Sequence, residues 1–107
     1  QLAMLGVEVV PQRVVIDRNR VTGAGVTAGI DFGLTLLKLL CGEQVAKMTQ
    51  LMMEYTPEPP FDAGTPETAG EEVVRSLMQL GKPLLDAFQT QTQKIAAGLN
   101  AETKLDR

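Results

Sequence analysis

The feature that most constrains the fold is a glycine-rich turn that joins a short strand to a helix of unusual apolarity. The strand-like run ends at Thr22, the turn covers Gly23–Gly25, and the helix starts near Val26 or Thr27. Apolar side chains lie on nearly every side of this helix: Ile30, Phe32, Leu34, Leu36, Leu37, Leu39 and Leu40. A helix that is apolar all round is typical of a core position, so we expect it to be buried on all sides.

The N-terminal end of this helix is a candidate site for an anion. Backbone N–H groups in the first turn of a helix have no partner within the helix and carry partial positive charge. They could hold a phosphate, a carboxylate or a thiolate. The alternative is that the glycines only allow close packing at a strand–turn–helix joint. Thr27 is a possible N-cap, Asp31 lies in the first turn, and Gly42 is a plausible stop signal.

Composition excludes several classes of function. The net charge is −3 and there is no basic stripe, so nucleic acid is not expected as a partner. No apolar run approaches the roughly 20 residues that cross a bilayer, so no membrane partner is expected. Histidine is absent and Cys41 is the single cysteine, which excludes an internal disulfide, a histidine-based triad and a zinc cluster on this chain. A lone cysteine suits a reducing compartment, so we expect a cytoplasmic location and a small, buried, unreactive Cys41.

A β-hairpin is predicted before the turn. Val14–Ile16 and Val21–Thr22 are rich in β-branched residues and flank a polar turn at Asp17–Arg20. These strands are too few to cover the apolar helix, so we expect further sheet elsewhere. The chain begins at Gln1 rather than methionine, which favours a piece of a larger protein.

The second half is predicted to be mostly helical. A helix is expected over Glu43–Tyr55, a proline-rich loop over Thr56–Gly70, and helical structure over Glu71–Leu99. Within the last segment, Gly81–Pro83 predicts either a kink or a break between two helices. Residues 100–107 are polar and are expected to fray.

The segment Arg20–Leu34, with the hairpin before it and Glu54–Asp62 after it, resembles the C-terminal half of the isonitrile hydratases of the ThiJ/PfpI superfamily. The resemblance implies an α/β fold, the C-terminal part of a flavodoxin-like, class I glutamine amidotransferase-like three-layer sandwich. Residues 1–99 would then be the C-terminal portion of one ThiJ/PfpI-type domain that lacks its N-terminal half.

The resemblance also implies a site and an activity. Members of this family carry a reactive cysteine on a strand-to-helix elbow upstream of everything in this chain, so no catalytic residue is expected here, and Cys41 does not match that elbow. Val26 matches the residue whose backbone N–H donates to the thiolate, with Thr27 and Gly25 beside it, and Tyr55 matches a pocket aromatic. The implied reaction is hydration of an isonitrile to an N-substituted formamide by a homodimer without metal or cofactor. This chain alone would be inactive.

Two other functions remain open. Related sequences serve as ligand-sensing domains of AraC-type transcription regulators, which would predict a helix-turn-helix region after the domain. A non-enzymatic family member would predict no upstream cysteine.

Overall fold

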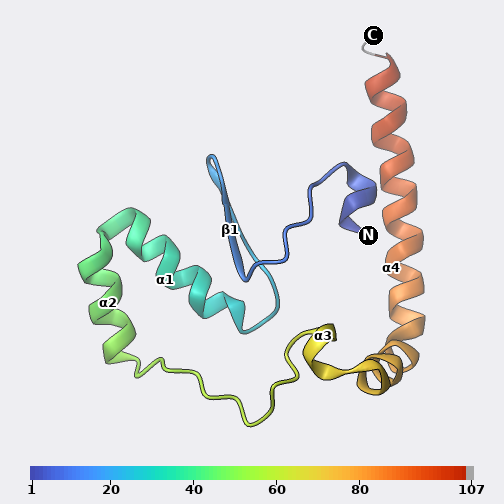
Figure 1. The fold of residues 1–107 in the computed structure, drawn as a ribbon. Helices are drawn as coiled ribbons and strands as arrows, with labels where there is room; N and C mark the ends of the chain where they lie inside the picture. The colour runs from blue at the N-terminus through green and yellow to red at the C-terminus, as the bar shows by residue number, and fades with distance from the viewer. Residues whose placement is uncertain (106–107) are drawn as a thin grey trace. The chain divides into compact units, whose positions relative to one another are not determined.

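The structure, a computed structural model, describes residues 1–105, with side chains described through residue 100. The elements are η1 (Leu2–Leu5), β1 (Val14–Asp17), β2 (Arg20–Gly23), α1 (Ala28–Cys41), α2 (Glu43–Met52), α3 (Pro66–Ala69) and α4 (Glu71–Leu105) (Figure 1). They fall into two compact units. Residues 10–58 form one, and residues 1–9 with the chain from Pro59 onward form the other.

The predicted hairpin is confirmed, with a tighter turn than expected. β1 and β2 pair antiparallel, and Asp17 pairs with Arg20, which leaves a turn of only Arg18 and Asn19. Arg18 adopts a left-handed conformation, with φ of 55°, to reverse the chain in this short space. The Ala24 N–H donates to the Arg13 carbonyl at 2.9 Å and extends the pairing beyond both strands.

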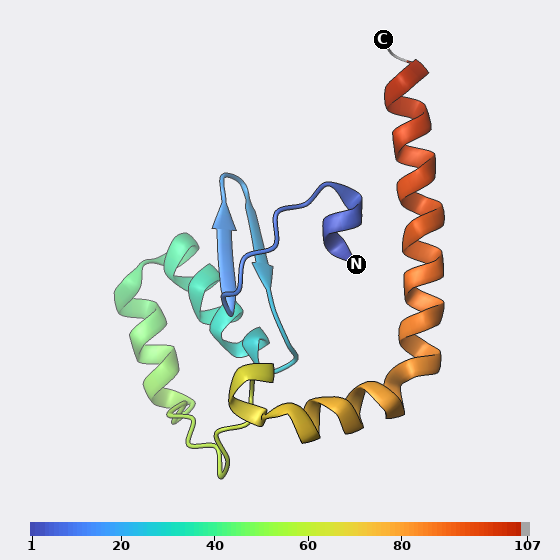
Figure 2. The ribbon, with the colours of Figure 1, turned by 45° about the vertical axis from the view of Figure 1, so that its right-hand side comes forward.

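Helix α1 follows the hairpin after the predicted glycine turn and packs against both strands (Figure 2). Thr27 directly precedes the helix, but its backbone is already helical and its side chain makes no capping hydrogen bond. Thr27 thus occupies the predicted N-cap position without a side-chain cap. Gly42 ends α1 as predicted, since its φ of 91° takes the chain out of the helix.

The expectation that α1 is buried on all sides was wrong for this chain. Ala28 is its one buried residue, at 1% exposure, whereas Leu40 is 81% exposed and Leu39 and Ile30 are also exposed. The reason is geometric: the two-stranded hairpin and α2 cover only part of the circumference of the helix. Cys41, at the uncovered end, is exposed rather than buried.

Helix α2 packs against α1, and the two helices are connected by Gly42 alone. Glu43 ties the two helices, since its carboxylate pairs with Lys38 of α1 at 3.3 Å and with Lys47 of α2 at 2.6 Å. The helix ends at Met52, three residues before the predicted end at Tyr55, because Glu54 takes a left-handed conformation with φ of 51°.

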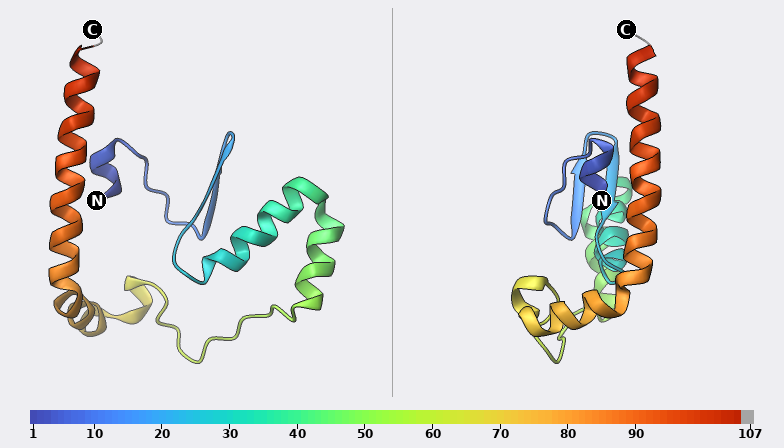
Figure 3. Two further views of the ribbon diagram at one scale, coloured as in Figure 1. Left: turned by 180° about the vertical axis from the view of Figure 1, so that it is seen from behind. Right: turned by 90° about the vertical axis from the view of Figure 1, so that its right-hand side faces the viewer.

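The other unit contains the long helix α4, against which η1 packs (Figure 3). Gln1 Nε2 donates to the Leu85 carbonyl at 3.4 Å. Pro83 lies inside α4, so the predicted interruption is a bend in one continuous helix and not a break (Figure 2). The helix runs to Leu105, beyond the predicted end near Leu99, and residues 106–107 of the expected tail lie outside the described residues.

The segment predicted to be loop over Thr56–Gly70 includes one short helix, α3. Pro66 starts it, a position where the missing N–H costs nothing. Thr65 caps it by accepting the Thr68 N–H at 3.3 Å. None of the described helices combines the length and apolarity that a bilayer crossing requires.

Candidate functional site

The turn between β2 and α1 presents backbone donors. In the described structure the N–H groups of Gly25, Val26 and Thr27 have no hydrogen-bond partner, while the next three N–H groups bond back to their carbonyls. Ala28 N–H donates to Gly25 at 2.9 Å and Gly29 N–H to Val26 at 3.2 Å. The helix N-terminus thus offers unsatisfied donors where the sequence predicts an anion-holding end.

The side chain of Val26 does not contribute packing. It is 99% exposed, so the residue presents its backbone without burying its side chain in this chain. Gly23, at the start of the turn, lies under Phe32: a Cβ built on Gly23 would stand 3.5 Å from Phe32 Cδ2. The Phe32 side chain of α1 therefore lies against the end of β2.

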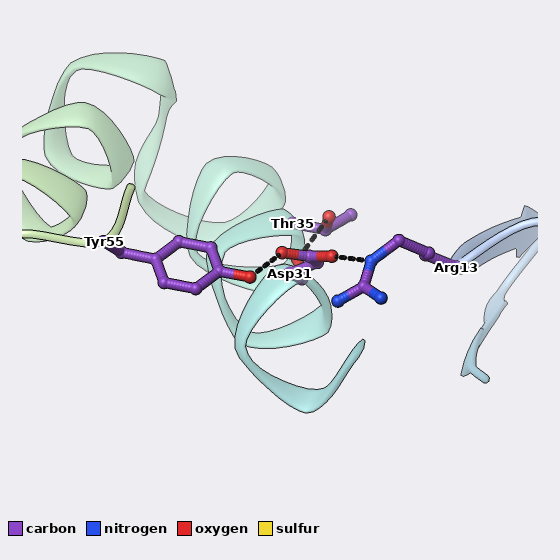
Figure 4. A network of polar contacts seen from close by, with 4 residues as sticks. All are labelled: Arg13, Asp31, Thr35 and Tyr55. Atoms are coloured by element: carbon purple, nitrogen blue, oxygen red, sulfur yellow. Dashed lines mark hydrogen bonds and ion pairs between the residues drawn. The ribbon is translucent and has the colours of Figure 1, made fainter. Parts of the chain in front are cut away.

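Tyr55, the fourth predicted site residue, reaches α1 through Asp31. Its hydroxyl donates to Asp31 Oδ1 at 2.6 Å, and Arg13 Nε donates to Asp31 Oδ2 (Figure 4). Thr35 Oγ1 donates to the Asp31 carbonyl at 2.7 Å one turn further along the helix. Among the described residues no hydrogen bond joins Tyr55 to Gly25–Thr27, so the structure brings Tyr55 to the helix and not to the turn itself.

The backbone of Tyr55 is held by the end of α2. Its N–H donates to the Gln50 carbonyl at 3.1 Å, and Gln50 Nε2 donates to the Tyr55 carbonyl at 3.2 Å. A surface hollow of about 540 Å³ lies beside it. Its lining residues are Lys47, Gln50, Leu51, Glu54, Tyr55 and Thr56, and none comes from the turn.

Protonation in this network follows from the hydrogen bonds. The Tyr55 hydroxyl, followed by the Arg13 guanidinium, lowers the pKa of Asp31 below its ordinary value. The same carboxylate raises the pKa of Tyr55, which stays a protonated donor, and raises that of Arg13. Asp31 is therefore an anion with both oxygens occupied.

The sequence alone did not reveal this network. The sequence identifies Asp31 only as an acidic residue in the first turn of a helix, and nothing in it singles out Arg13. They are separated by 18 positions, and Asp31 and Tyr55 by 24, so no local pattern links them. Among the described residues there is no group of three or more side chains that could hold a metal ion.

Comparisons with known proteins agree with the sequence resemblance. The chain is 46% identical over 99 residues to the isonitrile hydratase of Pseudomonas putida, covering 92% of this chain and 43% of that protein. It also matches the crystal structure of a ThiJ/PfpI family protein from Pseudomonas syringae, with a TM-score of 0.75 and 43% identity, over 89% of this chain and 38% of that chain. The chain is a partial relative of isonitrile hydratase and the ThiJ/PfpI proteins.

This relationship confirms the predicted resemblance and an α/β class, of which the described residues contain the helices and a two-stranded sheet. The chain spans less than half the length of each of these two relatives. No family model matches the sequence.

Proposed function

We propose that this chain is the C-terminal portion of an isonitrile hydratase-like lyase, which converts an isonitrile to an N-substituted formamide. The observation that carries the proposal is the 46% identity to an isonitrile hydratase across 92% of the chain. The exposed apolar face of α1 supports it, because a flavodoxin-like three-layer sandwich would cover that face with further sheet.

The reaction needs a nucleophile that an N-terminal half would supply. A cysteine thiolate attacks the terminal carbon of the isonitrile, a C–S bond forms, and that carbon takes up a proton to give a thioimidate. Water then adds to the same carbon and one of its protons goes to the nitrogen. The C–S bond breaks as the new hydroxyl gives up its remaining proton and becomes the carbonyl of the formamide, and this proton replaces the one taken up in the first step. The sulfur departs as thiolate and the cysteine is restored.

In this reaction the chain would stabilise the negative charge of the cysteine thiolate. The free N–H of Val26, with those of Gly25 and Thr27 beside it, is of the kind that stabilises a thiolate and lowers the pKa of its cysteine. Cys41 does not fit the role of nucleophile, because it lies at the opposite end of the 14-residue helix α1, on the order of 20 Å from the turn. Tyr55 supports the same region through Asp31. A homodimer and a cytoplasmic location belong to the same proposal.

The test is formamide production from a small isonitrile, followed by NMR, using the protein encoded by the complete reading frame that contains these residues. We expect activity that is lost when an upstream cysteine is replaced and retained in the control Cys41→Ser. A folded protein that produces no formamide would contradict the hydratase assignment and favour a sensor. Activity that survives removal of every upstream cysteine would contradict the mechanism.

A further inference from the structure

Three segments of the unit formed by residues 10–58 converge on one carboxylate (Figure 4). Arg13 directly precedes β1, Asp31 lies in the first turn of α1, and Tyr55 follows α2. Each oxygen of Asp31 has its own donor, and the Asp31 side chain is only 27% exposed. Hydrogen bonds to an ionised carboxylate are stronger than neutral ones. The bond from Tyr55 is part-buried, whereas the Arg13 side chain is 55% exposed, so Tyr55 is the more protected of the two donors.

Arg13 forms hydrogen bonds on both sides of the segment Gly25–Thr27. Its backbone carbonyl accepts the N–H of Ala24 at 2.9 Å, immediately before Gly25. Its guanidinium donates to the carboxylate of Asp31, four residues after Thr27. The turn of Gly25–Thr27 is therefore bracketed by two hydrogen bonds to one residue. The hydrogen bond on the helix side is made by the Asp31 carboxylate, and it adds to the packing of α1 against the hairpin.

Tyr55 bonds to the other oxygen of Asp31, on the side opposite Arg13 (Figure 4). Its hydroxyl proton is committed to Asp31, and its backbone is held in both directions by Gln50. This geometry makes Tyr55 a support for Asp31 and leaves its hydroxyl no proton to give a substrate while the bond to Asp31 persists.

We propose that Asp31, held by Arg13 and Tyr55, is a positioning residue that sets where the free N–H groups of the Gly25–Thr27 turn point. The inference rests on the proposed function for the use of those N–H groups, but the positioning itself is independent of any activity. Tyr55 then acts on the reaction through Asp31 and not by contact with the substrate.

The experiment compares Asp31→Asn, Tyr55→Phe and their double variant in the complete protein, with Asp17→Asn as the matched control. Asp17 lies in the same unit and its replacement removes the same charge, but among the described residues its side chain bonds only to the exposed Arg18 side chain. Tyr55→Phe keeps the test informative if Asp31→Asn fails to fold, because it removes one hydroxyl and leaves the carboxylate paired with Arg13.

The first readout is amide hydrogen exchange at Ala24 and at residues 28–31, whose N–H groups are hydrogen-bonded on either side of the turn. We expect exchange about tenfold faster in Asp31→Asn and Tyr55→Phe and unchanged in Asp17→Asn. The second is the ultraviolet titration of Tyr55, isolated as the difference between wild type and Tyr55→Phe. In wild type this tyrosine should titrate above its ordinary pKa, and Asp31→Asn should bring it back. Unchanged exchange, or an ordinary Tyr55 titration in wild type, would overturn the inference.

The third readout is isonitrile hydration. We expect kcat to fall roughly 10- to 100-fold in each single variant with KM changed less than about threefold, and the double variant to be no worse than the worse single one. Additive losses, or a changed KM in Tyr55→Phe alone, would mean that Tyr55 contacts the substrate, which overturns the inference. Faster exchange in a protein that hydrates no isonitrile would instead refute the proposed function and leave the positioning in place.

Discussion

Replacing Val26 by proline tests the backbone donor at the centre of the proposed site. Proline removes the N–H of residue 26, which has no partner in the described structure, and little packing is lost because Val26 is 99% exposed. The Val26 carbonyl, which accepts the Gly29 N–H at 3.2 Å, is retained. The matched control is Val26→Ala, which shortens the side chain and keeps the N–H.

The expected magnitude follows from these two facts. An almost fully exposed side chain contributes little to folding, so Val26→Ala should change the free energy of unfolding by less than about 0.5 kcal/mol. Loss of a single backbone donor to a reacting anion costs about 10²- to 10³-fold in rate, or roughly 3–4 kcal/mol. Val26→Pro should therefore lower the rate of isonitrile hydration by that factor in the complete protein, while Val26→Ala stays within about twofold of wild type.

Two measurements separate this effect from misfolding. Circular dichroism and thermal melting should be close to wild type in both variants. Cysteine alkylation as a function of pH should show the pKa of the catalytic thiol raised in Val26→Pro, because a donor to the thiolate form has been lost. A correctly folded Val26→Pro protein with wild-type rate and thiol pKa would refute the assignment of this N–H to the thiolate.

Two further predictions concern stability. The hydrogen bonds from Tyr55 and then Arg13 hold the pKa of Asp31 below its ordinary value, so their contribution to the free energy of unfolding is complete above about pH 3.8 and is lost as the pH falls through the lower folded value. Chemical denaturation across this range should show a steeper loss of stability with acid in wild type than in Asp31→Asn. Parallel curves for the two proteins would contradict the prediction. Gly81→Ala should stabilise α4 by about 0.5–1 kcal/mol, because the new Cβ would stand 3.6 Å from Leu85 Cδ1, an ordinary contact, and a helical glycine loses more conformational freedom on folding; a lower melting temperature would contradict it.

Local signals in the sequence were enough to predict the elements around the site. β-Branched residues on both sides of a polar turn predicted the hairpin, and the glycine at position 42 predicted the end of α1. Each of these depends on backbone preferences of a few adjacent residues. The errors at the ends of α2 and in the loop before α4 arose where a single residue, Glu54 or Thr65, took a conformation or a cap that its neighbours do not dictate.

Contacts between distant residues could not be predicted in the same way. The Arg13–Asp31–Tyr55 junction joins positions that only the packing of α1 against the hairpin and α2 brings together. The site as predicted therefore contained the donors at the turn and Tyr55, but not Asp31 and Arg13, which connect Tyr55 to α1 and to the hairpin. An unsatisfied N–H is useful to an anion only if its direction is fixed, so the missing part is the one that decides preorganisation.

Helix α1 is more apolar than its exposure in this chain requires. The hairpin and α2 leave the side chains of Leu39 and Leu40 exposed. Apolar side chains lose free energy of burial when they remain in contact with water. The apolar pattern is therefore matched to a larger surface than these two elements provide. The relatives of this chain are more than twice its length. Under the proposed function, a further layer of sheet would cover the leucines and an upstream cysteine would take up the free N–H groups of the turn. The proposed function therefore treats the exposed helix and the unsatisfied donors as one feature.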